Sequence, residues 1–143
     1  MGRAFALTIC LVIGMTTLVG CGAISGGSAA GLEDVEWQLV ASSVSAVDLG
    51  AYGITATFSD GTVGGTGGVN SYGAPYTVRG DALEIGDVTS TLIAALDEQA
   101  NVAEAAYFGL LPETAHYEID EAAGTLTLFD AGRNAILVFK RGE

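Results

Sequence analysis

The chain is poor in the residues that most often carry metal and nucleophile chemistry. Its cysteines are Cys10 and Cys21, and His116 is the single histidine among 143 residues. A zinc site of the usual kind draws on several cysteine or histidine ligands, and a Ser-His-Asp triad pairs its histidine with an activated nucleophile. The Gly-x-Ser-x-Gly nucleophile elbow is missing, because Val69 stands where its first glycine would have to be. We therefore expect no metal, no cofactor and no catalytic residues.

Basic residues are also scarce. The chain has 5 lysines and arginines against 17 aspartates and glutamates, which gives a formal net charge of −12. Such a surface repels the phosphates of nucleic acids and anionic lipid headgroups, so we exclude nucleic acid as a partner. The carboxylates are scattered and show no Asp-x-Asp-x-Asp-Gly spacing, so they indicate solubility rather than a calcium loop.

What the chain does have is an apolar run that starts near Ala4, after Arg3, and ends at Leu18-Val19-Gly20-Cys21. A positive start, an apolar stretch and small residues at the end form the three-part pattern of a secretory signal. Leu18 to Cys21 is similar to a bacterial lipobox, in which cleavage precedes the cysteine and the cysteine carries the lipid. The alternative is a retained membrane helix, but the run barely reaches the roughly 18 residues that a spanning helix needs.

These features divide the chain into three parts. Residues 1–20 are predicted to be a signal peptide, and Cys21 is the predicted lipidation site that anchors the protein to the membrane on the extracytoplasmic side. Residues 21–31 are small and rich in glycine and serine, which is typical of a tether. Residues 32–143 suit one domain. Because Cys10 would be removed and Cys21 lipidated, this domain would be held by core packing without an internal disulfide.

Within the domain, short alternating segments rich in strand formers are separated by turn signals such as Ser59-Asp60-Gly61 and Arg79-Gly80-Asp81. Residues 101–111 instead have helical spacing, with Asn101 and Glu104 as a predicted capping box and Pro112 as the stop. This rhythm favours an antiparallel barrel or sandwich with one helix. The predicted strands span residues 35–40, 54–58, 62–63, 75–78, 82–85, 117–120, 125–129 and 135–139.

A glycine-rich stretch, residues 65–76, invites comparison with nucleotide-binding loops. The comparison fails, because Gly65-x-Gly67 leads to Asn70 where a third glycine is needed, and no Gly-Lys-Ser/Thr follows. We interpret the glycines as sites of positive φ or of close strand approach. Asn70 is predicted to tolerate the left-handed region and to bond its local backbone. Three aromatic residues are predicted to pack in the core: Trp37, Tyr72 and Tyr76.

Five short motifs follow one another in a fixed order. They are Trp37-Gln38-Leu39; residues 65–76 with Gly65, Gly68, Asn70, Tyr72 and Tyr76; residues 91–95, opened by Thr91; the helix residues Glu104, Tyr107 and Leu111; and Leu126-Thr127-Leu128. In this order they resemble the META-domain family of HslJ-like bacterial lipoproteins and envelope proteins, over about residues 32–140. The resemblance implies a mainly β (α+β) fold, a small antiparallel β-barrel with one helix packed against it.

The chain departs from the family pattern at two points. Val69 and Ala95 stand where the family has cysteines, and the paired loss suggests that the two positions are neighbours, a pair that relatives can cross-link. Gly73 and Ala74 are exchanged relative to the pattern, so the turn expected there would differ in detail.

The resemblance and the signal together predict a non-enzymatic envelope lipoprotein, an interaction or stress-tolerance module that is a monomer. Its expected partners are the membrane, through the lipid on Cys21, and an unidentified envelope protein or small ligand. The alternative is a carrier of a small apolar ligand inside the barrel, since barrels of this size can hold one small molecule. A cavity beside Trp37, Tyr72 and Tyr76 would favour the carrier, and a packed interior the interaction module. An enzyme ranks last.

Overall fold

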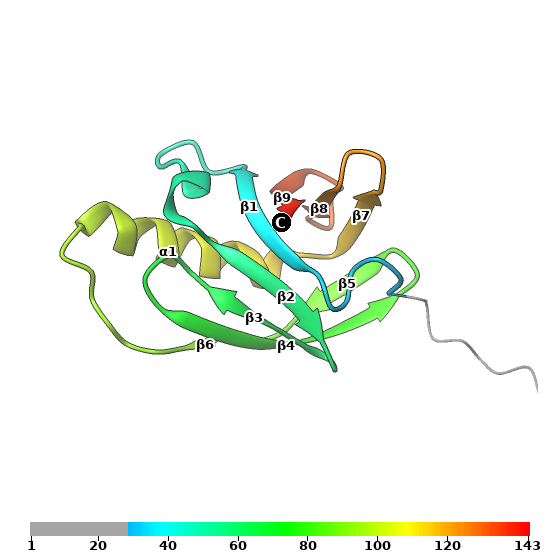
Figure 1. The fold of residues 1–143 in the computed structure, drawn as a ribbon, viewed down its shortest axis with the longest axis horizontal. Helices are drawn as coiled ribbons and strands as arrows, with labels where there is room; N and C mark the ends of the chain where they lie inside the picture. The colour runs from blue at the N-terminus through cyan, green and yellow to red at the C-terminus, as the bar shows by residue number, and fades with distance from the viewer. Residues whose placement is uncertain (1–28) are drawn as a thin grey trace, which may run out of the picture.

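The computed structural model describes residues 29–143, in which nine strands form one sheet around a core, with one α-helix (Figure 1). The strands are β1 (Glu36–Ser42), β2 (Thr55–Ser59), β3 (Thr62–Thr66), β4 (Ser71–Arg79), β5 (Ala82–Ile85), β6 (Thr89–Ser90), β7 (His116–Asp120), β8 (Thr125–Phe129) and β9 (Ala135–Arg141). They pair antiparallel in the order β3-β2-β1-β9-β8-β7-β5-β4-β6, and β3 also pairs with β4, so the sheet closes into a ring. The predicted fold class, β-dominated with one helix, is confirmed.

The eight strands predicted from alternation are all present, with shifts at their ends. The hairpin between β2 and β3 follows its turn signal: Asp60 and Gly61 have φ of 49° and 75°, and Ser59 pairs with Thr62. Two consecutive residues with positive φ are what a two-residue hairpin of matching twist requires.

Two differences concern β4 and β6. β4 begins at Ser71, four residues earlier than predicted. Gly73 and Ala74 therefore lie within a strand, and the expectation of a turn there is wrong. Gly73 pairs with Gly64 on one side and Thr89 on the other. β6 was not predicted, since a strand of two residues shows no alternation.

The interior of the ring is filled by large side chains. Phe58 packs edge to face on Tyr76, with ring centroids 5.1 Å apart. The indole N–H of Trp37 donates to the carbonyl of Leu32 at 3.0 Å, and the Arg141 guanidinium lies 5.6 Å from the centroid of the Trp37 ring. The prediction that Trp37 belongs to the core is confirmed. The largest fully buried residues are Trp37, Tyr107, Phe58, Phe139, Leu32, Leu39, Leu49, Ile54, Leu83, Leu111, Leu126 and Leu128.

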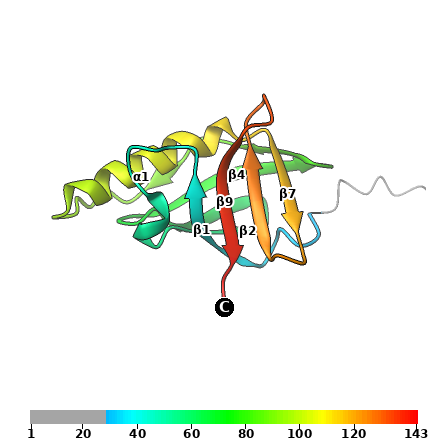
Figure 2. The ribbon, with the colours of Figure 1, turned by 90° about the horizontal axis from the view of Figure 1, so that it is seen from above.

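The helix α1 (Glu98–Leu110) lies along one side of the sheet and continues into the short 3₁₀ turn η2 (Leu111–Glu113) (Figure 2). Its predicted start at Asn101 is wrong. The N-cap is Asp97, whose carboxylate accepts from the Gln99 N–H at 3.0 Å. The α-helix ends at Leu110, before Pro112 as predicted, but Leu111 keeps helical φ and ψ and the chain goes on through Pro112 as η2. One face of α1 is buried: Ala100, Ala103, Glu104, Tyr107 and Leu110.

The described chain begins with a turn in which the Leu32 N–H donates to the Ala29 carbonyl at 2.9 Å. Ala29 packs against the core. The predicted signal peptide and Cys21 lie outside the described residues, so they stay predictions. Within residues 29–143, no helix combines the length and the apolar character that crossing a membrane requires.

Candidate functional site

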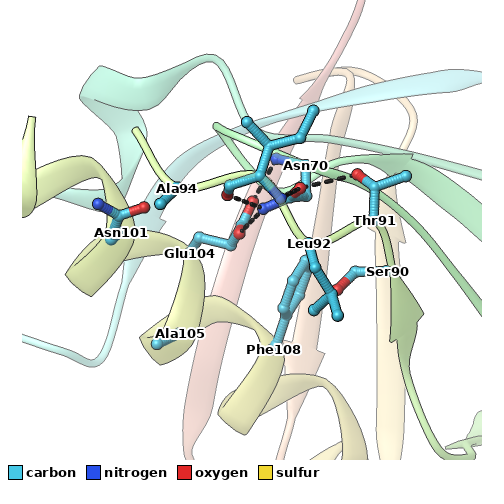
Figure 3. Close-up of a pocket in the computed structure, with 10 residues that line it drawn as sticks. Asn70, Ser90, Thr91, Leu92, Ala94, Asn101, Glu104, Ala105 and Phe108 are labelled. Atoms are coloured by element: carbon cyan, nitrogen blue, oxygen red, sulfur yellow. Dashed lines mark hydrogen bonds between the residues drawn. The ribbon is translucent and has the colours of Figure 1, made fainter. Parts of the chain in front are cut away.

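Three of the motif residues, far apart in the sequence, meet beside α1 (Figure 3). Asn70 comes from the connection between β3 and β4, Glu104 from the buried face of α1, and Thr91 from the chain just after β6. Residues 91–96, called the 91–96 segment below, join β6 to the helix. The hydrogen bonds of this cluster show what each residue does.

Glu104 is a carboxylate that is only 8% exposed. Its Oε2 accepts from the backbone N–H groups of Val69 at 3.1 Å and of Asn70 at 2.5 Å, and its Oε1 accepts from Asn70 Nδ2 at 2.6 Å. Hydrogen bonds to a charged acceptor are about twice as strong as neutral ones, and three of them offset the loss of water around the carboxylate. Glu104 therefore fastens the β3–β4 connection to the helix, with both oxygens already engaged.

The carboxamide of Asn70 takes the place of a peptide group. Its Nδ2 donates to the Ile93 carbonyl at 2.9 Å, while its Oδ1 accepts from the Ile93 N–H at 2.7 Å and from Thr91 Oγ1 at 2.7 Å. The expectation that Asn70 adopts the left-handed region and bonds its own local backbone is wrong, because its φ is not positive and its side chain reaches residues about twenty positions away. It extends the sheet pairing beyond the start of β4.

Asn101 repeats the arrangement two residues further along. Its Oδ1 accepts from the Ala95 N–H at 2.9 Å and its Nδ2 donates to the Ala95 carbonyl at 3.0 Å. Two side-chain amides thus hold alternate residues, Ile93 and Ala95, in an extended segment. No local pattern indicates this role, because the spacing Asn101-x-x-Glu104 is identical to that of a capping box.

The glycines of this stretch have the structural roles expected of them. A Cβ on Gly65 would run into the Thr55 backbone, with the Thr55 carbonyl carbon 2.8 Å away. Gly68 has φ of +106°, a conformation that side chains other than glycine rarely adopt. Among the described residues, no helix opens after Gly67, so the geometry of a phosphate-binding loop is absent here.

The tyrosines of the motifs are core residues, as predicted for Tyr72 and Tyr76. Tyr72 and Tyr76 are each 7% exposed, and Tyr107 is fully buried. The Tyr72 hydroxyl lies 2.6 Å from that of Tyr107 and donates to the Thr55 carbonyl at 3.0 Å. Burial raises the pKa of Tyr72 to about 12 and the pKa of Tyr107 well above its usual value. Both hydroxyls stay protonated at neutral pH and join the helix to β4 and β2.

His116 lies at the start of β7, outside this cluster. Its Nδ1 is buried without a hydrogen-bond partner among the described residues, 3.8 Å from Asp81 Oδ2. The same Asp81 oxygen accepts from Arg133 at 2.6 Å, and this hydrogen bond holds the pKa of Asp81 below its usual value. Residues 29–143 contain no group of three or more His, Cys, Asp or Glu side chains placed to hold a metal ion.

An open hollow of about 370 Å³ lies between the 91–96 segment and α1. Its helix side is formed by Asn101, Ala105 and Phe108, and Asn70 and Glu104 also line it. Leu92 is 98% exposed and Ile93 64% exposed, and Leu96 is fully exposed. The hydrogen bonds of the cluster thus hold in place a segment whose apolar side chains Leu92, Ile93 and Leu96 are exposed.

The family model of the META domain matches residues 30–143, which is most of the chain. The chain belongs to the META-domain family. The NMR structure of a protein from Burkholderia xenovorans has a similar fold, with a TM-score of 0.62 and 23% identity over 80% of this chain and 87% of that one. A second NMR structure gives a TM-score of 0.56 and 18% identity over 79% of this chain and 93% of that one. No curated protein matches the chain.

The contacts of this META domain also bear on Val69 and Ala95, where the family resemblance placed cysteines. The Val69 N–H bonds Glu104 and the Ala95 N–H bonds Asn101, and these two helix residues are three positions apart. Residues at i and i+3 are neighbours on one helix face. Both positions are therefore held against the same turn of α1; that they lie close enough to be cross-linked stays a prediction.

Proposed function

We propose that this META domain is a non-enzymatic binding module of the bacterial envelope, held on the membrane by a lipid on Cys21 and specific for a protein partner. The proposal rests on a difference between the polar and the apolar residues of the motif region. Its polar residues Asn70, Glu104 and Asn101 are engaged in internal hydrogen bonds, whereas the neighbouring Leu92 and Leu96 are exposed. Exposed apolar side chains gathered at one place mark interaction surfaces.

The chemistry of the polar groups supports a role other than catalysis. A general acid or base has to reach a substrate proton, whereas the oxygens of Glu104 face Val69 and Asn70. The nearest carboxylate to His116 is that of Asp81, which Arg133 already binds. Neither group is arranged beside an activated nucleophile, which a hydrolase of the triad type needs.

The interior supports a binding surface over a ligand carrier. Trp37 is fully buried, Tyr72 packs edge to face on Tyr107 at 5.5 Å, and Tyr76 packs on Phe58. Aromatic side chains thus occupy the space in which a small apolar ligand would have to sit. Protein interiors packed in this way have little room for a guest.

The position of the start of the described chain fits an anchored module. The start of the described chain and the 91–96 segment lie at opposite ends of the molecule in both views (Figures 1 and 2). A lipid attached upstream of residue 29 would hold the first end near the membrane. The apolar segment would then be left free for a partner in the envelope.

Replacing Cys21 by serine tests the proposed anchoring of the protein to the membrane. We expect wild-type protein in the membrane fraction, with a mature N-terminus at Cys21 that carries acyl chains, because two chains anchor stably where one does not. Cys21→Ser should accumulate as an uncleaved precursor or be shed. Mass spectrometry of the membrane-purified protein decides the matter, and intact residues 1–20 on the wild-type mature form would contradict the lipoprotein proposal.

A further inference from the structure

The end of the sheet at β6 has an unpaired edge. β6 is last in the strand order and pairs with β4 through Tyr72 opposite Ser90 and Gly73 opposite Thr89. The pairing continues past β6, since the Thr91 N–H donates to the Ser71 carbonyl at 3.1 Å. Antiparallel neighbours alternate between pairs that exchange hydrogen bonds and pairs that do not. With residues 91 and 71 bonded, the backbone groups of Ser90 point away from β4.

The two asparagine side chains continue this alternation. Asn70 binds both backbone groups of Ile93, and Asn101 binds both of Ala95, so the N–H groups of residues 91, 93 and 95 are all bonded on the same edge. The N–H groups of Leu92 and Ala94 have no partner among residues 29–143. The chain from Ser90 to Ala95 therefore continues beyond the end of β6 with one edge held by hydrogen bonds and the other open.

This edge lacks the devices that usually protect one. Natural edge strands are blunted by lysine, proline, bulges or a covering element. Residues 89–96 read Thr-Ser-Thr-Leu-Ile-Ala-Ala-Leu, with no charge, no proline and no glycine, and residues 89–94 are all exposed. A strand left open in this way is a template for pairing with another chain.

The charges around the edge indicate which chain it suits. From Gly80 to Gly132 the sequence contains no lysine or arginine, and the exposed residues flanking the strand include Asp87, Asp97 and Glu98. A second copy would bring the same acidic flanks and a net charge of −12, so edge-to-edge pairing of two copies is opposed by repulsion. An anionic membrane surface is opposed for the same reason. A basic partner is attracted.

We infer that residues 90–95 form a β-augmentation site, at which a partner protein adds an extended, apolar segment flanked by lysine or arginine. The partner's backbone pairs with the free N–H and C=O groups of Leu92 and Ala94. Its apolar side chains cover Leu92, Ile93 and Leu96 and enter the adjoining hollow beside Phe108. This inference rests on the proposed function, and it names the site and the chemistry of the partner.

The test uses a fluorescent synthetic peptide of alternating valine and threonine with two lysines at each end, added to the lipidated protein in nanodiscs of zwitterionic lipid. We expect saturable binding by fluorescence anisotropy, together with slower amide exchange over residues 90–95. A peptide with glutamate in place of lysine should bind at least about tenfold more weakly, because the flanking carboxylates repel it. A peptide N-methylated on the edge that pairs should also lose about tenfold or more, since main-chain hydrogen bonds give the affinity.

Two protein variants make the test specific. Leu92→Lys puts a charge on the edge and should weaken peptide binding about tenfold or more without lowering Tm, because Leu92 makes little contact with the domain. The matched control is Val40→Lys, another exposed apolar residue, on β1, which should bind as wild type. Equal effects of the two variants would overturn the site.

The remaining outcomes are equally decisive. If the lysine-flanked peptide does not bind, the inference is overturned. It is also overturned if the protein forms a dimer that Leu92→Lys dissociates, because the edge would then belong to a second copy. Protection of residues 90–95 by empty nanodiscs assigns it to lipid and also overturns it. Binding with protection elsewhere on the domain overturns this site but leaves the proposed binding module intact. Loss of the lipid on Cys21 bears on the address alone.

Discussion

Replacing Glu104 by alanine is expected to lower the free energy of unfolding by about 3–5 kcal/mol, because it removes the charged acceptor of three hydrogen bonds at once. Those donors are the N–H groups of Val69 and Asn70 and the Asn70 Nδ2 group. Urea denaturation followed by the fluorescence of Trp37, the single tryptophan and fully buried, measures the loss.

Two further variants separate this role from a general effect of charge. Glu98→Ala removes an exposed carboxylate from the first turn of the same helix and should cost at most about 1 kcal/mol, through the helix dipole. Glu104→Gln keeps the shape but offers an NH₂ group to the donor Asn70 Nδ2, so an intermediate loss of about 1–3 kcal/mol is expected. A loss for Glu104→Ala no larger than that for Glu98→Ala would show that Glu104 does not hold the cluster together.

Adding a single methyl group at Gly65 is expected to lower the free energy of unfolding by about 1–3 kcal/mol, since β2 and β3 would have to separate to admit it. The new Cβ would lie 2.8 Å from the carbonyl carbon of Thr55. The measurement is the same urea titration.

Gly109, on α1, provides the matched control. A Cβ there meets nothing within 4 Å, so Gly109→Ala should leave the stability unchanged or raise it by up to about 1 kcal/mol, because alanine favours helix over glycine. If Gly65→Ala behaved like Gly109→Ala, the close approach of the strands at Gly65 would not be a constraint on the fold.

Much of the sheet could be predicted because most of its strands have a local sequence pattern. Residues 54–58 and 125–129 alternate in burial as their sequences alternate, and the turn at Asp60-Gly61 carries its own signal. The start of β4 could not be predicted because Gly73, Ala74 and Pro75 are poor strand formers that tertiary pairing holds in place. Ring closure through β3 and β4 came from the family resemblance, not from periodicity.

The residues of the site could be predicted, but the contacts between them could not. The resemblance selected Asn70, Thr91 and Glu104, but hydrogen bonds between residues 21 and 34 positions apart leave no local pattern. Local sequence does not distinguish Asn101 from Asp97 as the N-cap, because both are good capping residues and the choice depends on where the helix packs. The pairing of both asparagines with the 91–96 segment emerged only from the structure.

Asn70 and Asn101 hold the chain from residue 91 to residue 95 with one edge hydrogen-bonded and the other open. Amide hydrogen exchange measured by NMR at single residues tests it directly. The N–H groups of Ile93 and Ala95 should exchange at least about tenfold more slowly than those of Leu92 and Ala94, since only the first pair is bonded. Asn70→Ala should remove the protection at Ile93. Equal exchange at all four amides in the wild-type protein would show that the two asparagines do not hold this edge.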